Sequence, residues 1–389
     1  MEEIRLIKDK KAEDQYTQIA HYCFTDDIGW TDHIFPLGFG DTGYGCYEGE
    51  QLVTGAITRN FEVNLLGTIL RMSGISIVES APHVRNKGYV RKIMFRIIQE
   101  DRKRGMVLSS LRPFKFSYYE KFGYGYLGGT HFSSFRPDNI ALPDPHTGSI
   151  VPFDGSEKQL KDMYDCHDRW VGTWSFGIVS RRVTAAALTE ELARQKDHLF
   201  LYYRDGLCRG YIRITLKATA QYVFELTVKK TAWDDADAFQ ALMNLIRNHR
   251  DQVREARWFI PPSIPIQLCM KNPRITGSVM ADYMARPLDV TALLDLKTRR
   301  SPVRGKVVFS IQDEILPDNT ATYSLSGTEI KKADFRDENT LPLPVFSSLL
   351  FGAYSLEDAE LAGTAPTGMG DAAREFFRKD PRIYLSEYF

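Results

Sequence analysis

The chain has 389 residues, of which 43% are hydrophobic and 26% are charged, and its 50 basic and 50 acidic side chains give a formal net charge of zero. This length predicts about two or three domains, and the composition is typical of a globular protein. Because the charges balance, no strongly basic field is expected to bind nucleic acid. The sequence has no run of about 18 apolar residues, so no membrane span is expected.

The five cysteines are scattered and form no Cys-x-x-Cys motif. Their odd number and spacing favour reduced thiols, and the charged N-terminal segment lacks the apolar core of a signal peptide. We therefore expect a cytoplasmic location. The eight histidines show no metal-ligand spacing, so no metal is expected.

The first predicted element is a helix in residues 6–23, where apolar side chains recur at helical spacing. After it, residues 24–35 interleave three carboxylates with aromatic side chains. Asp26, Asp27 and Trp30 are therefore candidates to line a pocket for a cationic substrate. The alternative is a solvated loop with capping aspartates.

The most informative stretch is a strand followed by a helix. Residues 70–78 are rich in β-forming side chains, Pro82 ends that run, and apolar residues recur at three- and four-residue spacing from about Tyr89. Between them lies a turn with one glycine and several basic side chains, residues 85–90. A helix start leaves backbone N–H groups unpaired and favours anions, and glycine lets the backbone approach a ligand closely. We interpret this basic turn as a pyrophosphate site; the alternative is a solvated basic helix start.

The surrounding elements narrow the interpretation. A hairpin is predicted in residues 45–58, a short buried strand in residues 106–111, and the motif Tyr-x-x-Phe-Gly-Tyr occupies residues 119–124. The first 150 residues or so resemble the GNAT family of acyl-CoA-dependent N-acyltransferases. The resemblance lies in the order of elements: a hairpin, a strand, a helix that begins with Arg-x-x-Gly, a second strand and this motif.

The resemblance implies acetyl-CoA as cosubstrate. It places Tyr119 as the general acid for the leaving thiolate, because a phenol with a pKa of about 10 stays protonated at pH 7. A backbone N–H near Val78 would polarise the thioester oxygen. The implied acetyl-CoA contacts are Val78, Ser80, Arg85, Asn86, Lys87, Gly88, Tyr89 and Val90.

A second unit follows a Pro/Gly/Asp-rich segment at residues 137–148. Its hairpin, strand, helix and strand repeat the order of the first unit, so it resembles a degenerate GNAT domain. At the start of its helix, Asp234 and Asp235 stand where the first unit has basic residues and glycine. Because these carboxylates would repel a pyrophosphate, this unit is not expected to bind CoA. The predicted elements are helices at 157–169, 184–193 and 236–247, a hairpin at 199–212, and strands at 224–228 and 256–260.

A third part has paired strands at residues 305–312 and 321–326 and helices at 343–351 and 356–363. It resembles the sterol-carrier-like domain that closes the Eis family of acetyltransferases, and the whole order of domains matches that family. The predicted fold is α/β (α+β): two tandem GNAT-like domains with mixed, splayed central sheets, then a sterol-carrier-protein-2-like α/β domain. The domains are expected at residues 1–148, 149–284 and 285–389.

The Eis resemblance implies an N-acetyltransferase that acts on polycationic small molecules such as aminoglycosides and assembles as a hexamer. It also implies that the terminal carboxylate, that of Phe389, deprotonates the acceptor amine. Burial among aromatic side chains would raise the pKa of this carboxylate from about 3.5. Glu387, Asp26 and Trp30 are the expected acceptor contacts. The alternatives are a protein lysine or N-terminal acetyltransferase on the same fold and, ranked lower, a non-catalytic lipid-binding protein.

Overall fold

The computed structural model describes residues 2–24, 30–143, 147–261 and 263–385. The chain divides into two compact units. Unit 1 consists mainly of Met1–Gly128 and Asp282–Asp380, and unit 2 mainly of Gly129–Ala281. No helix among the described residues is long and apolar enough to cross a membrane.

The first part of unit 1 is a mixed sheet with the strand order β1-β2-β3-β4-β5-β13. Neighbours from β1 to β4 are antiparallel, β4 and β5 are parallel, and β13 pairs antiparallel with β5. The strands are β1 (Glu2–Leu6), β2 (Thr42–Glu48), β3 (Gln51–Leu65), β4 (Thr68–Ser80), β5 (Leu108–Leu111) and β13 (Thr276–Pro287).

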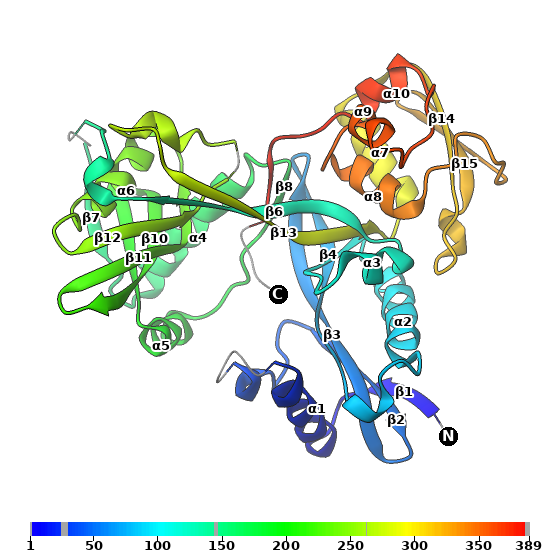
Figure 1. Ribbon diagram of the computed structural model, residues 1–389, viewed down its shortest axis with the longest axis horizontal. Helices are drawn as coiled ribbons and strands as arrows, with labels where there is room; N and C mark the ends of the chain where they lie inside the picture. Colours follow the sequence, from blue (N-terminus) through cyan, green and yellow to red (C-terminus); the bar gives the residue numbers. More distant parts are fainter. Residues whose placement is uncertain (1, 25–29, 144–146, 262, 386–389) are drawn as a thin grey trace. The chain divides into compact units, whose positions relative to one another are not determined.

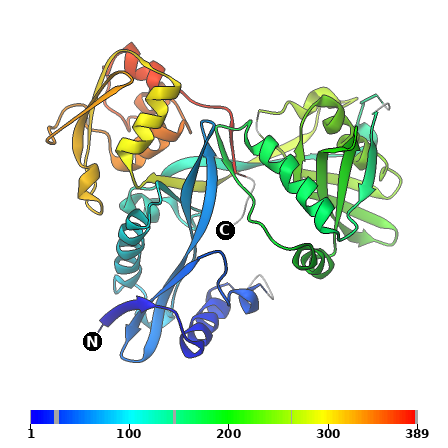
Figure 2. The ribbon, with the colours of Figure 1, turned by 180° about the vertical axis from the view of Figure 1, so that it is seen from behind.

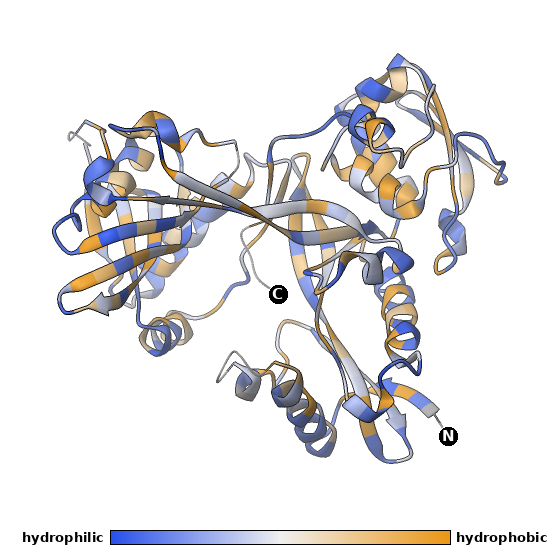
Figure 3. Cartoon of the chain, in the orientation of Figure 1, coloured by the Kyte–Doolittle hydropathy of each residue, from blue (hydrophilic) through white to orange (hydrophobic). Residues whose placement is uncertain are grey.

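Two helices, α1 (Lys10–Cys23) and α2 (Tyr89–Lys103), cover opposite faces of β3 and β4 (Figures 1 and 2). Consecutive residues of β3 are therefore buried, as expected for a strand covered on both faces. Hydrophobic and hydrophilic residues both occur in each turn of α2 (Figure 3), and Ile93 and Ile97 are fully buried. Each such side chain contributes about 1.5–3 kcal/mol on burial, so the amphipathic pattern fixes which side of α2 faces the sheet.

The last part of unit 1 contains a three-stranded antiparallel sheet with the order β14-β15-β16. Its core is aromatic: the ring of Phe309 lies 5.6 Å from that of Tyr323 and 5.3 Å from that of Phe346. The elements are α7 (Val290–Arg300), β14 (Val303–Ile311), β15 (Ala321–Gly327), β16 (Glu329–Ala333), α8 (Leu343–Phe351), α9 (Leu356–Leu361) and α10 (Asp371–Phe376).

The same strand path continues in unit 2 with the order β6-β12-β11-β10-β9-β7, and unit 2 also contains a short parallel pair, β8 with β17. Hairpin, strand, helix and strand occur again as β9–β10, β11, α6 and β12, which is the repeat that the sequence predicts. The strands are β6 (Gly125–Phe135), β7 (Ser149–Pro152), β8 (Phe176–Ile178), β9 (Asp197–Arg204), β10 (Leu207–Ala220), β11 (Val223–Trp233), β12 (Val253–Phe259) and β17 (Ile383–Tyr384). The helices are α4 (Glu157–Val171), α5 (Ala185–Gln195) and α6 (Ala236–Arg247).

Candidate active site

A cavity of about 490 Å³ lies in unit 1 where β4 ends and α2 begins. It contains every predicted acetyl-CoA contact except Val78 and Lys87. It also contains residues that the sequence analysis did not select, among them Lys121, Phe122 and Glu314. The lining residues are Ser80, Val84, Arg85, Asn86, Gly88, Tyr89, Val90, Arg91, Tyr118, Lys121, Phe122 and Glu314.

Gly88 is the N-cap residue of α2 and lines the cavity. It has φ +82°, a left-handed conformation that favours glycine, and a Cβ built on it meets no described atom within 4 Å. Among the described residues no side chain caps this helix start. Its first N–H groups are therefore available to an anion, which fits the diphosphate of CoA.

The basic side chains of the turn face different ways. The guanidinium of Arg85 lies 5.6 Å from the ring centroid of Tyr22, and Arg85, Arg91 and Lys121 all line the cavity. Lys87 instead forms an ion pair with Glu48, at 3.4 Å. Arg85, Arg91 and Lys121 thus supply the positive charge of the cavity.

Glu48, at the end of β2, holds the turn in place. Its carboxylate accepts a hydrogen bond of 2.5 Å from the Tyr89 hydroxyl, and this bond, together with Lys87, lowers the pKa of Glu48. The conformation of the turn therefore depends on a contact with the neighbouring hairpin as well as on its own sequence.

The strand before the turn, β4, separates from β5 while it stays paired with β3 up to Ser80. Its pairing with β5 ends at Ile75 and Leu111, so residues 76–80 have no partner on that side within β5. Opposite β3, the register shifts between Gly55 and Ile57, and Ile77 has φ +51°. This bulge changes the direction of the backbone at Val78. The splayed strand that the family resemblance implies is therefore present.

Tyr119 lies directly behind the cavity wall. Its ring centroid is 5.3 Å from that of Tyr118 and 6.5 Å from that of Phe122, and both of these residues line the cavity. Tyr119 is 3% exposed, and burial raises its pKa above the ordinary value. The phenol therefore keeps its proton at neutral pH.

Glu79, beside Val78 on β4, is a buried acid that the sequence analysis did not single out. It is 3% exposed, and neither carboxyl oxygen has a hydrogen-bond partner among the described residues. Burial, and secondarily the nearby Cys23, raises the pKa of Glu79 to about 10, so it is protonated at neutral pH. Its position in a strand of β-forming residues gave no signal, because burial of this side chain depends on the packing of α1.

The expected acceptor contacts are only partly described. Asp26, Asp27, Glu387 and Phe389 lie outside the described residues. Trp30 is partly buried and packs edge-to-face on Phe24, with ring centroids 5.3 Å apart.

Unit 2 differs from unit 1 at the corresponding helix. The start of α6 is capped by Asp235, whose carboxylate accepts from the Ala238 N–H at 3.0 Å. Arg204 bridges Asp235 and Asp237, at 2.6 and 2.7 Å. The helix start is therefore occupied by the protein's own carboxylates. The sequence predicts this for Asp235, whereas Asp234 instead pairs with Arg169, at 2.9 Å.

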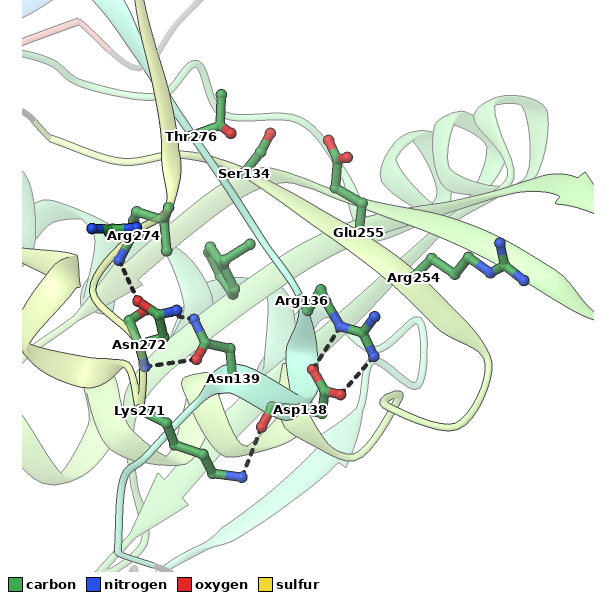
Figure 4. Close-up of a pocket in the computed structure, with 12 residues that line it drawn as sticks. Ser134, Arg136, Asp138, Asn139, Arg254, Glu255, Lys271, Asn272, Arg274 and Thr276 are labelled. Atoms are coloured by element: carbon green, nitrogen blue, oxygen red, sulfur yellow. Dashed lines mark hydrogen bonds and ion pairs between the residues drawn. The ribbon is translucent and has the colours of Figure 1, made fainter.

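A second cavity, of about 590 Å³, lies elsewhere in unit 2 (Figure 4). Two of its charged groups pair with each other: Arg136 forms two hydrogen bonds to the carboxylate of Asp138, whose backbone carbonyl also accepts from Lys271 at 2.8 Å. A polar network of this kind is typical of a solvated surface, and we assign no ligand to it.

Comparisons with known proteins agree with this architecture. Residues 3–127 and 177–287 each match a family described as Acetyltransferase (GNAT) domain, and residues 290–385 match the Sterol carrier protein domain. The chain belongs to the GNAT acetyltransferases. Its two GNAT domains and sterol carrier protein domain form the tandem architecture of the Eis family. It is therefore an N-acetyltransferase, and the GNAT fold implies acetyl-CoA as the acetyl donor.

Solved structures of the same fold are distant in sequence. This GNAT protein is similar to Eis1 from Mycobacterium abscessus, at 18% identity, a TM-score of 0.84 and full coverage of both chains. It is also similar to a GCN5-related N-acetyltransferase from Anabaena variabilis, at 17% identity and a TM-score of 0.86, and to a probable N-acyltransferase from Enterococcus faecalis, at 19% and 0.84, again with full coverage of all chains. No curated protein sequence matches this one.

Proposed function

We propose that this GNAT protein transfers the acetyl group of acetyl-CoA to amines of polycationic small molecules, with aminoglycosides as the model class. The observation that carries the proposal is the cavity at the basic turn. It combines an uncapped helix start, a left-handed Gly88 and three cationic side chains, and Tyr119 lies directly behind its wall.

The proposed reaction begins with binding of the diphosphate at the start of α2. Arg85, Arg91 and Lys121 would hold it there, and the backbone at Val78 would polarise the thioester oxygen. Acetyl-CoA supplies an activated acetyl group. The acceptor nitrogen forms the new C–N bond, the C–S bond breaks, and Tyr119 donates its proton to the departing thiolate.

The proton of the acceptor ammonium needs a base. We propose the terminal carboxylate of Phe389 for this role, with Asp26, Trp30 and Glu387 at the acceptor. Carboxylates and an aromatic ring suit a polycation, because they provide both charge neutralisation and a cation–π contact. The family resemblance further implies a hexamer, which light scattering on the purified protein measures.

The test is an assay of thiol release with acetyl-CoA and a panel of amines that contains aminoglycosides, simple polyamines and lysine peptides. We expect turnover with polycationic small molecules. Turnover with the peptides alone would replace this acceptor class by protein lysines or N-termini. Absence of CoA binding in calorimetry would exclude the acetyl-CoA site itself.

A further inference from the structure

We infer that the sterol carrier protein domain supplies part of the acetyl-CoA cavity, and that Arg286 is the positioning residue that joins this domain to the wall containing Tyr118 and Phe122. The inference rests on the proposed function, because it takes the cavity at the basic turn to be the acetyl-CoA site. Glu314 lines that cavity although it belongs to the matched sterol carrier protein domain.

Arg286 contacts Phe122, which lines the cavity, and Asp313, which precedes the lining residue Glu314. It is fully buried on β13, and its Nη2 lies 2.5 Å from the Oδ2 of Asp313. Its Nη1 donates to the carbonyl oxygen of Phe122. Phe122 lines the cavity and Asp313 precedes Glu314, so one guanidinium fixes two segments that are distant in sequence.

The loop that carries Glu314 is fixed on its other side as well. The Oδ1 of Asp313 accepts hydrogen bonds from the N–H groups of Ile315 and Leu316, both at 3.0 Å. Ile315 and Leu316 are buried in the hydrophobic core of the first GNAT domain. Glu314 itself is exposed. It is therefore presented to the cavity by an ordered loop.

A second contact holds the segment that carries Tyr119. Ser347, on α8, donates from its hydroxyl to the carbonyl oxygen of Gly123 at 2.9 Å. The residues from Tyr119 to Gly123 are thus bound by polar contacts from β13 and from the sterol carrier protein domain. A buried ion pair adds little net stability compared with an apolar pair of similar volume. What the Arg286–Asp313 pair adds here is a defined position for both segments.

Glu314 also sets the charge of the cavity. Among the described lining residues it is the one carboxylate, whereas Arg85, Arg91 and Lys121 are cationic. A carboxylate in this position lowers the positive potential that a phosphate group meets. The third domain would therefore adjust the affinity for a polyanionic cosubstrate.

The first experiment changes this charge without disturbing the core. In Glu314→Lys the affinity for CoA, measured by calorimetry, should rise at least several-fold, and the gain should shrink as salt is added. The matched control is Glu338→Lys, an exposed residue of the same domain that does not line the cavity. Equal affinity in the two variants would overturn the assignment of Glu314.

The second experiment removes the ion pair as a unit, so that no buried charge is left unpaired. The double variant R286M/D313L should bind CoA about 10-fold more weakly and raise the KM for acetyl-CoA, with little change in the KM for the acceptor. The control R213M/D197L removes a comparable buried pair, at 2.6 Å, in unit 2. A folded R286M/D313L protein with wild-type affinity would refute the positioning role. A wild-type protein without CoA affinity would refute the proposed function instead.

Discussion

At the scale of single residues, Tyr119 offers the most direct test of the chemistry. Removing its hydroxyl in Tyr119→Phe should lower kcat by roughly 100-fold and leave CoA affinity unchanged, because general acid catalysis typically contributes 10²–10⁴-fold. Burial raises the pKa of this phenol above its ordinary value. At pH values lower than about 10, loss of this proton should therefore cause no decline in the wild-type rate. Steady-state kinetics against pH measure both effects.

Tyr118→Phe is the control for this variant. Tyr118 contacts Tyr119 and lines the cavity, and it is less buried. It should change kcat only a few-fold. Equal losses in the two variants would remove the case for Tyr119 as the proton donor.

Glu79 makes stability depend on pH. Below the ordinary pKa of 4.5 both the folded and the unfolded chain hold its proton. Above it the unfolded chain releases the proton while the folded protein keeps it up to about pH 10, so stability falls with rising pH, by up to about 1.4 kcal/mol per unit. Glu79→Gln removes this titration. The free energy of unfolding of Glu79→Gln minus that of the wild type should therefore increase between about pH 5 and pH 9.

Urea denaturation at several pH values measures this difference. Glu62→Gln, at an exposed position on the adjacent β3, is the control and should follow the wild-type pH dependence. A constant difference between Glu79→Gln and wild type across this range would show that Glu79 does not retain its proton in the folded state.

Single residues of the candidate site can be selected from the sequence where the signal is local. Gly88 and Arg85 were predicted because the basic turn and the helix after it are adjacent in the chain. Glu314 could not be found this way, since the fold alone brings it to the start of α2. Lys121 lies within the motif at residues 119–124, at a position that the motif does not specify. The sequence did not indicate that Glu79 is buried, for a related reason: its burial depends on the helix packed over β4.

At the scale of elements, we predict that a substitution at the start of α2 weakens CoA binding. Gly88→Ala places an L-residue at φ +82°, which costs about 1–2 kcal/mol, and adds a methyl group at the mouth of the cavity. The protein should remain folded and bind CoA at least about 10-fold more weakly. Gly49→Ala is a matched control, because Gly49 has φ +62° and equally open space but lies in the β2–β3 turn.

Calorimetry with CoA and thermal unfolding separate the two effects of Gly88→Ala. The melting temperatures of both glycine variants should fall by similar amounts, whereas only Gly88→Ala should lose affinity. Loss of affinity in both would mean that backbone strain alone, without the phosphate site, explains the result.

Long, periodic elements were easier to predict than short ones. The helices at 236–247 and 343–351 have the predicted bounds. The first combines apolar periodicity with the cap Asp235, whereas the second is apolar on most sides and is bounded by Pro342 and Gly352. The strands β1 and β16 have five residues each and were not predicted. Their formation depends on pairing with β2 and β15, which no pattern within five residues can indicate.

At the scale of the whole molecule, the third domain shares a compact unit with the first GNAT domain. The sequence indicates three successive modules, but it does not show that residues 282–380 pack with the first module. Ile315 and Leu316 are buried in the hydrophobic core of the first GNAT domain, which favours this association, and the buried pair of Arg286 and Asp313 fixes the position of the two segments. The third domain thereby brings Glu314 to the cavity at the start of α2.

The terminal carboxylate gives the prediction that involves the full chain. If the α-carboxylate of Phe389 is the base, deleting Phe389 or extending the chain beyond it with a short tag should reduce turnover to near the uncatalysed rate. CoA affinity should remain unchanged, because the basic turn is untouched. The same tag at the N-terminus serves as the control. Full activity in the C-terminally extended protein would exclude this carboxylate as the base.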